Sequence, residues 1–229
     1  MLMLFRYDNR REVLVAERRY VIMRTMLTRL GFVNVILLCL LATGCSGLLQ
    51  SKAPNNVPPS QTPGEYFPLS ENSYWEYEGE GNEFASFTRE VIFIKDNRAQ
   101  IRENNGGTIS MSVFEITDEA VTRVFFQGEA YNDVNLIEQE ANDNTIILKA
   151  PLVVSTKWGK PESGLREIIE VNTSVDTPAG TFDGCIKVKI TGDNSTLYEY
   201  FKSGVGMVKR EFVSGEARVT SSLSKYEVK

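Results

Sequence analysis

From Gly64 to the C-terminus, apolar and polar residues alternate with a period of two, and this pattern limits the possible folds more than any other feature. β-Branched and aromatic residues are enriched in the alternating segments, as is typical of strands. Neighbouring segments are joined by short turns such as Asp96-Asn97 and 104–107 (NNGG), so neighbouring strands must be antiparallel. One or two helical turns fit at 131–140. The pattern predicts strands at 74–78, 87–94, 98–103, 108–117, 120–127, 145–150, 165–175, 182–191, 196–202, 206–213 and 217–227.

The charge of the chain argues against nucleic acid as a partner. The whole chain has 25 basic and 30 acidic side chains, but residues 1–44 carry seven arginines and three acids, so 18 basic and 27 acidic side chains follow. Nucleic-acid binding depends on clustered Lys and Arg that neutralise phosphates. A part of the chain this acidic therefore predicts other partners.

Histidine is absent from the sequence, which excludes Ser-His-Asp, Cys-His and His-metal chemistry. Cys39 and Cys45 belong to the N-terminal segment, so Cys185 alone cannot form an internal disulfide or a multi-cysteine zinc site. Alternation places Cys185 on the face of Lys187, unless a bulge at Gly184 turns it inward. We interpret Cys185 as an inert small residue of the sheet. No cofactor is predicted.

The N-terminal segment has the order of a secretory signal. An apolar run at 30–41 follows two arginines and gives way to small residues before Cys45. A membrane-spanning helix needs about 20 apolar residues, whereas this run is shorter and contains an asparagine. We therefore predict a cleavable signal peptide over 1–44. The segment ahead of the run is unusually long, and a true start at Met23 or Met26 is a further hypothesis.

Residues 41–45 (LATGC) resemble the lipobox of bacterial lipoproteins. The resemblance implies that Cys45 carries a thioether-linked diacylglyceryl group and becomes the first residue after cleavage. Two acyl chains give stable attachment, so we expect a lipid anchor on the extracytoplasmic face of the cell membrane, or in the outer membrane of a Gram-negative host. Residues 45–64, with four prolines among small polar residues, predict a flexible tether, and 65–229 a single β-domain.

Two further segments, 175–183 (VDTPAGTFD) and 198–211 (YEYFKSGVGMVKRE), resemble a group of uncharacterised bacterial lipoproteins and secreted proteins. The group carries a TPAGTF turn and a GVG-x-VK strand, and the similarity covers roughly 66–213. It implies an all-β fold in which a long antiparallel sheet curls into an open half-barrel, distantly like that of lipoprotein carriers. It brings no catalytic residues. Pro178 and Gly180 predict a tight turn within the first segment.

Other patterns have simple structural explanations. Glu76, Glu78 and Glu80 project from one strand face, but no oxygen-rich loop accompanies them, which favours a solvated face over a calcium site. Residues 204–206 (GVG) begin like a dinucleotide loop but lack the surrounding βαβ unit, which favours a turn. The aromatic side chains most simply fill the core, and lining a ligand groove is the alternative.

These observations lead to a hypothesis about function with two alternatives. We expect a non-catalytic binding or envelope-structural module whose partner is an envelope protein or an apolar ligand. One alternative is a carrier of a lipid or other apolar ligand, and the other is a hydrolase that uses carboxylates alone, as glycosidases do. The sequence predicts no catalytic, metal or cofactor-binding residue, and Cys45 is the one predicted modification site. A deep apolar cavity would favour the carrier, and paired buried carboxylates the hydrolase.

Overall fold

The structure is a computed structural model that describes residues 61–161 and 164–229. Cys45, the signal predicted over 1–44 and most of the predicted tether lie outside these residues, so lipid anchoring stays a prediction. In the described part of the chain, no helix has both the length and the apolar character needed to cross a membrane.

The described residues form one sheet of twelve antiparallel strands in the order β6-β5-β4-β3-β2-β1-β12-β11-β10-β9-β8-β7. Strands close in sequence pair with each other, and β1 joins the two halves of the sheet by pairing with β12. A short 3₁₀ turn, η1 (Pro63–Tyr66), precedes the strands. The strands are β1 (Tyr74–Glu80), β2 (Phe87–Lys95), β3 (Arg98–Asn104), β4 (Ile109–Ile116), β5 (Ala120–Gln127), β6 (Thr145–Lys149), β7 (Lys157–Trp158), β8 (Leu165–Thr177), β9 (Gly180–Thr191), β10 (Thr196–Lys202), β11 (Gly206–Ser214) and β12 (Ala217–Glu227).

The residues of β1 illustrate how alternation produces this sheet. Trp75 and Tyr77 are buried, while Glu76 and Glu78 between and after them are exposed. The predicted turns are also present: Asp96, with φ of 53°, lies in the turn between β2 and β3, where residues that tolerate positive φ are favoured. The solvated face predicted for the β1 glutamates is therefore correct.

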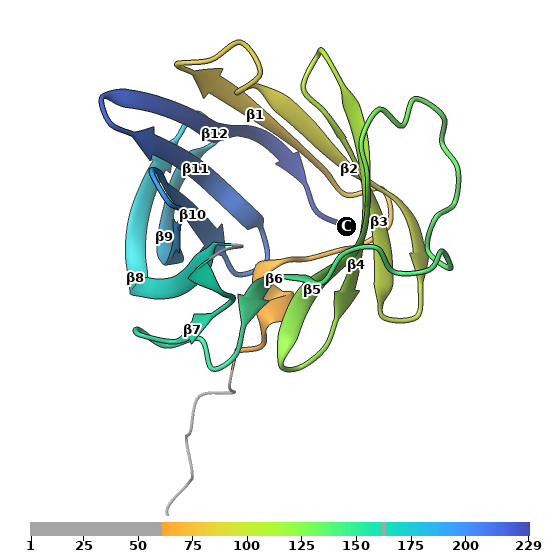
Figure 1. Ribbon diagram of the computed structural model, residues 1–229, viewed down its shortest axis with the longest axis horizontal. Coiled ribbons are helices and arrows are strands. Elements are labelled where there is room, and N and C mark those ends of the chain that lie inside the picture. Colours follow the sequence, from red (N-terminus) through yellow and green to blue (C-terminus); the bar gives the residue numbers. More distant parts are fainter. Residues whose placement is uncertain (1–60, 162–163) are drawn as a thin grey trace, which may run out of the picture. The chain divides into compact units, whose positions relative to one another are not determined.

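The sheet curls until its two edge strands approach each other (Figure 1). Side chains connect these edges: Trp158 Nε1 of β7 donates to the Ile146 carbonyl of β6 at 3.0 Å, and Arg166 Nη1 of β8 reaches the Ile147 carbonyl at 3.5 Å. The predicted all-β fold with a long curved antiparallel sheet is confirmed. Its nearly closed, barrel-like form depends on this side-chain seam.

The segment that contains η1 lies inside the curl (Figure 1, orange). The Phe67 ring centroid lies 5.0 Å from that of Phe114 on β4 and 6.3 Å from that of Phe201 on β10. The Gly204 amide, in the turn between β10 and β11, donates to the Glu65 carbonyl at 2.7 Å. The predicted turn at 204–206 is thus confirmed, and it fixes η1 within the sheet.

A long loop replaces the helical turns expected at 131–140, where no helix is present. The buried Gln100 of β3 holds this loop, because its Nε2 donates to the Val134 carbonyl at 2.8 Å and its Oε1 accepts from the Leu136 amide at 2.7 Å. Leu136 packs with Met111 of β4 in a second apolar cluster on the outer face of the sheet. One buried amide side chain therefore satisfies a backbone that a helix would have satisfied internally.

A bulge in β9 settles where Cys185 points. Thr173 of β8 lies opposite Cys185 and Val175 opposite Phe182, so β9 has one extra residue between these pairs. Gly184 lies in the bulge with φ of 72°, a left-handed conformation that favours glycine. Cys185 is completely buried as a result, which confirms the inward alternative.

Candidate functional site

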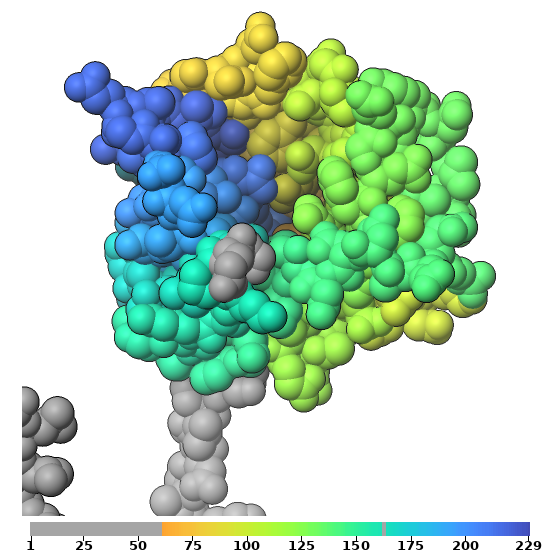
Figure 2. Space-filling view, in the orientation of Figure 1, coloured from red at the N-terminus to blue at the C-terminus, as the bar shows by residue number. Residues whose placement is uncertain are grey.

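The inner face of the curled sheet lines a cavity of about 300 Å³. Figure 2 shows a hollow in this face of the molecule, between the strands coloured blue and those coloured green. The side chains around the cavity come from strands on both halves of the sheet. Its charged lining residues are Arg89 (β2), Glu103 (β3), Arg123 (β5), Arg166 (β8), Glu199 (β10) and Arg210 (β11).

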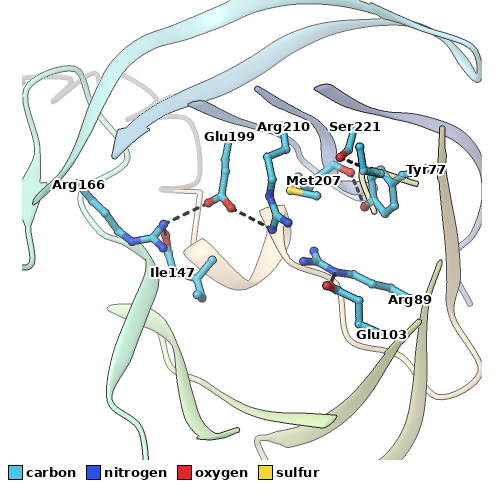
Figure 3. Close-up of polar contacts among 10 residues, drawn as sticks. Tyr77, Arg89, Glu103, Ile147, Arg166, Glu199, Met207, Arg210 and Ser221 are labelled. Atoms are coloured by element: carbon cyan, nitrogen blue, oxygen red, sulfur yellow. Dashed lines mark hydrogen bonds and ion pairs between the residues drawn. The ribbon is translucent and has the colours of Figure 1, made fainter. Parts of the chain in front are cut away.

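Glu199 lies at the centre of the charged groups on one wall (Figure 3). Its Oε2 accepts a hydrogen bond from Arg166 Nη1 at 3.1 Å, and its Oε1 accepts one from Arg210 Nη2 at 3.2 Å. The Glu199 side chain is only 6% exposed, so water does little to screen these pairs. Charge-assisted hydrogen bonds of this kind fix the three side chains in one arrangement.

A second ion pair faces the first (Figure 3). Arg89 Nε donates to Glu103 Oε2 at 2.7 Å. The guanidinium carbons of Arg89 and Arg210 lie 5.2 and 5.5 Å from the centroid of the same Phe87 ring, so both cations gain a cation–π contact. We call Glu103, Arg89, Arg210, Glu199 and Arg166 the charge network.

The pKa values of both glutamates in the network are lowered. Burial by itself raises the pKa of Glu199, but the charges of Arg166, Arg210 and Arg89 outweigh it and hold the pKa below its ordinary value. Burial acts in the same direction on Glu103, and Arg89 and Arg210 again lower its pKa. Both side chains are therefore carboxylates at neutral pH.

Aromatic side chains pack against the charge network. The Phe87 ring stacks on Tyr77 with centroids 4.4 Å apart. Tyr77 is buried, its hydroxyl donates to the Met207 carbonyl at 2.8 Å, and burial raises its pKa to about 12. Trp75 Nε1 donates to the Val205 carbonyl at 2.7 Å. These two hydrogen bonds connect β1 to Val205 and to Met207 of β11. They hold Tyr77 in place against the Phe87 ring that both guanidinium groups contact.

Arg123 forms a separate, electrically neutral pair at the cavity. Its Nε donates to Asp143 Oδ2 at 2.5 Å, and its guanidinium carbon lies 4.9 Å from the Phe126 ring centroid. Phe126 lines the cavity and yet is 42% exposed, which places it where the cavity meets solvent. The Arg123 pair therefore belongs to the rim.

The sequence patterns alone did not indicate any member of the charge network as a functional residue. The sequence does contain a signal for a buried charge, because inward positions of a strand recur every second residue and an acid at such a position is conspicuous. Leu197, Glu199 and Phe201 share the inward face of β10, and an acid between two core positions predicts a buried partner. The identity of that partner requires the register of strands distant in sequence. Among the described residues, no group of three or more acids and cysteines is arranged to hold a metal ion.

The described residues thus combine a curled antiparallel sheet with a charged interior cavity. A protein from Bacteroides fragilis described as exported and YmcC-like in fold is 15% identical over 70% of this chain and 97% of its own, with a TM-score of 0.44. A protein from Parabacteroides distasonis described as a lipoprotein is 16% identical over 71% and 98%, with a TM-score of 0.43. A hypothetical protein from Chlamydia trachomatis is 6% identical over 72% and 90%, with a TM-score of 0.29. No family and no curated protein matches the sequence.

Proposed function

We propose that this chain is a membrane-anchored, extracytoplasmic lipoprotein that binds a small ligand in its interior cavity without transforming it. The observation that carries the proposal is the cavity of about 300 Å³, whose charged lining is already fixed by ion pairs. Small-molecule sites are usually preformed cavities of about 300–1,000 Å³ with a few placed polar groups. The anchor and location are supported by the signal-like segment, Cys45 and the resemblance to bacterial lipoproteins.

The state of the carboxylates favours binding over hydrolysis. A glycosidase needs one carboxyl group that is still protonated near neutral pH, which requires a raised pKa. The pKa values of Glu103 and Glu199 are both lowered instead. Each carboxylate also accepts hydrogen bonds from arginine, so neither is free to protonate a leaving group.

The distribution of polarity argues against a carrier of wholly apolar ligands. A mainly apolar cavity beside Phe67, Leu69 and Trp75 has a volume of only about 20 Å³, enough for a single water molecule. A second hollow, of about 310 Å³, has charged and polar lining residues, among them Glu76 and Asn104. The interior cavity of similar volume, about 300 Å³, is lined by the charge network. A wholly apolar ligand there would desolvate these charges without replacing their contacts with water.

Filling the cavity tests the proposal. Ser112 of β4 lines the cavity, so Ser112→Trp should displace the ligand, while Glu78→Trp adds the same side chain at an exposed position of β1. Small molecules retained by each purified full-length variant would be extracted and compared by mass spectrometry. We expect the native chain and the Glu78→Trp variant to yield a molecule that the Ser112→Trp variant lacks.

Circular dichroism would verify that both variants keep the strand spectrum of the native chain. If a folded Ser112→Trp variant retains the same molecules in the same amounts, the cavity is not the binding site and the proposal is wrong.

A further inference from the structure

We infer that the cavity takes an anionic ligand: an oxyanion group, carboxylate or phosphate, on a small apolar body, with the oxyanion beside Arg89 and Arg210. This inference rests on the proposed function and adds the chemical class of the ligand. It follows from the charge, the hydrogen bonds and the apolar wall of the cavity.

The charge network has a residual positive charge. It contains the three cations Arg89, Arg166 and Arg210 and the two anions Glu103 and Glu199. The remaining charged residue in the lining, Arg123, is neutralised by Asp143 at the rim. Among residues 61–161 and 164–229, one positive charge in the interior is thus left without a protein counter-ion, and this in a part of the chain that is acidic overall.

A buried net charge is costly unless something pairs with it. Arg89, Arg166 and Glu199 have side chains that are 14%, 13% and 6% exposed, so bulk water compensates their charges poorly. Arg210 and Glu103, by contrast, are 28% and 32% exposed and lie nearer to solvent. Replacing buried ion pairs by apolar residues of similar volume is often neutral or stabilising, so stability alone does not explain these charges. An anion that enters the cavity would neutralise the excess and lower this cost.

The hydrogen bonds of Arg210 point to the position of the anion. Its Nη2 atom donates to Glu199, and its Nε atom has no hydrogen-bond partner among the described residues. A buried donor without a partner is unfavourable, and native structures rarely contain one. Because Nε has almost no accessible surface, an anion in the cavity would contact the Nη atoms of Arg210. Arg89 and Arg210 both contact the Phe87 ring, and their guanidinium groups point toward the same region in Figure 3, where we place an oxyanion that pairs with both.

The rest of the lining determines the body of the ligand. Phe67, Phe114, Phe201 and Met207 contribute an apolar wall next to the network. A cavity of about 300 Å³ lies at the small end of the range for ligand sites, which limits the ligand to a short chain or a single ring. The cavity thus matches a small amphiphile with one charged end.

Binding of three probes with the same apolar body, a pentyl chain, tests the inference. Radiolabelled hexanoate, pentyl phosphate and hexanamide would be titrated by equilibrium dialysis against the full chain in phosphatidylcholine vesicles, with empty vesicles as background. We expect at least one of the two anions to bind about tenfold or more tightly than hexanamide, as one charge-assisted hydrogen bond predicts.

Two cavity variants and one surface variant identify the site. Arg210→Met removes the excess charge and should abolish the preference for the anion. Glu103→Gln increases the excess charge and should strengthen anion binding several-fold. Arg218→Met removes an arginine from an exposed position of β12 and should leave binding unchanged. Circular dichroism would establish that each variant is folded.

The outcomes separate this inference from the proposed function. Equal binding of the anions and hexanamide, or equal effects of Arg210→Met and Arg218→Met, would overturn the anionic ligand while leaving the cavity as a binding site. If no probe binds above the empty vesicles, neither the inference nor the proposed small-ligand site survives.

Discussion

Two interior arginines depend on Glu199 for their counter-ion, because its two carboxylate oxygens accept hydrogen bonds from Arg166 and Arg210. Glu199→Gln would leave both guanidinium groups without their counter-ion. We expect the free energy of unfolding to fall by about 3–5 kcal/mol, the range found when one partner of a buried ion pair is removed. Glu170→Gln, which breaks a more exposed pair with Lys187, should cost less than about 1 kcal/mol. Urea unfolding of both variants measures the difference, and similar losses would contradict a buried network.

The lowered pKa values of Glu103 and Glu199 also predict how stability depends on pH. The ordinary value is 4.5, and the native values lie below it. The stabilisation is therefore complete above about pH 4.5 and is lost as the pH falls through the native pKa values. In urea unfolding at a series of pH values, the stability difference between the native chain and Glu199→Gln should shrink below pH 4.5. A difference that stays constant down to pH 2 would show that the pKa of Glu199 is not lowered in the folded state.

Cys185 should be chemically inert in the folded chain. It is completely buried, and burial raises the pKa of its thiol to about 11, so the reactive thiolate is scarce at neutral pH. Peptide mapping after iodoacetamide treatment should find Cys185 unmodified in the native chain and modified after denaturation in urea. Rapid labelling of the native chain at pH 7 would show that the bulge at Gly184 opens.

Alternation of apolar and polar residues predicts long strands well, but it predicts short strands and irregular loops poorly. The strands of seven residues or more carry several inward and outward positions each, so their period is readable from the sequence. β7 has two residues, Lys157–Trp158, which is too short to show a period, and its pairing with β8 was missed. The loop around Leu136 was misread because the side chain that holds it, Gln100, is distant in sequence. The charge network required strand register for the same reason.

The shorter of the two side-chain hydrogen bonds in the seam between the sheet edges is an indole bond that can be removed. Trp158→Phe deletes the donor to the Ile146 carbonyl and should destabilise the fold by about 1 kcal/mol. Trp75→Phe, which deletes a similar bond to Val205, is the matched control away from the seam. In hydrogen–deuterium exchange, Trp158→Phe should speed exchange in β6, whereas Trp75→Phe should not. Unchanged exchange in β6 would mean that the seam does not hold the edges together.

For the whole molecule, the predicted anchor and tether decide where the cavity works. Metabolic labelling with a clickable fatty acid should label the native chain and not Cys45→Ser, with the native chain in the membrane fraction. Equal labelling of the two would contradict lipidation. Since tether length sets the effective concentration near envelope partners, deleting residues 52–60, ahead of η1, should weaken crosslinking to a partner in intact cells while circular dichroism of the deletion variant stays unchanged.

We propose, above all, that the cavity inside the sheet is occupied by a ligand in the native membrane. The most direct measurement is an experimental structure of the full chain purified from its native membrane without added ligand. We predict density for a small non-protein molecule in the cavity, with an oxyanion in hydrogen-bonding contact with Arg210 and an apolar part against Phe201. The contradicting result would be a cavity that contains only water while the ligand of the same preparation is bound on the outer face of the sheet.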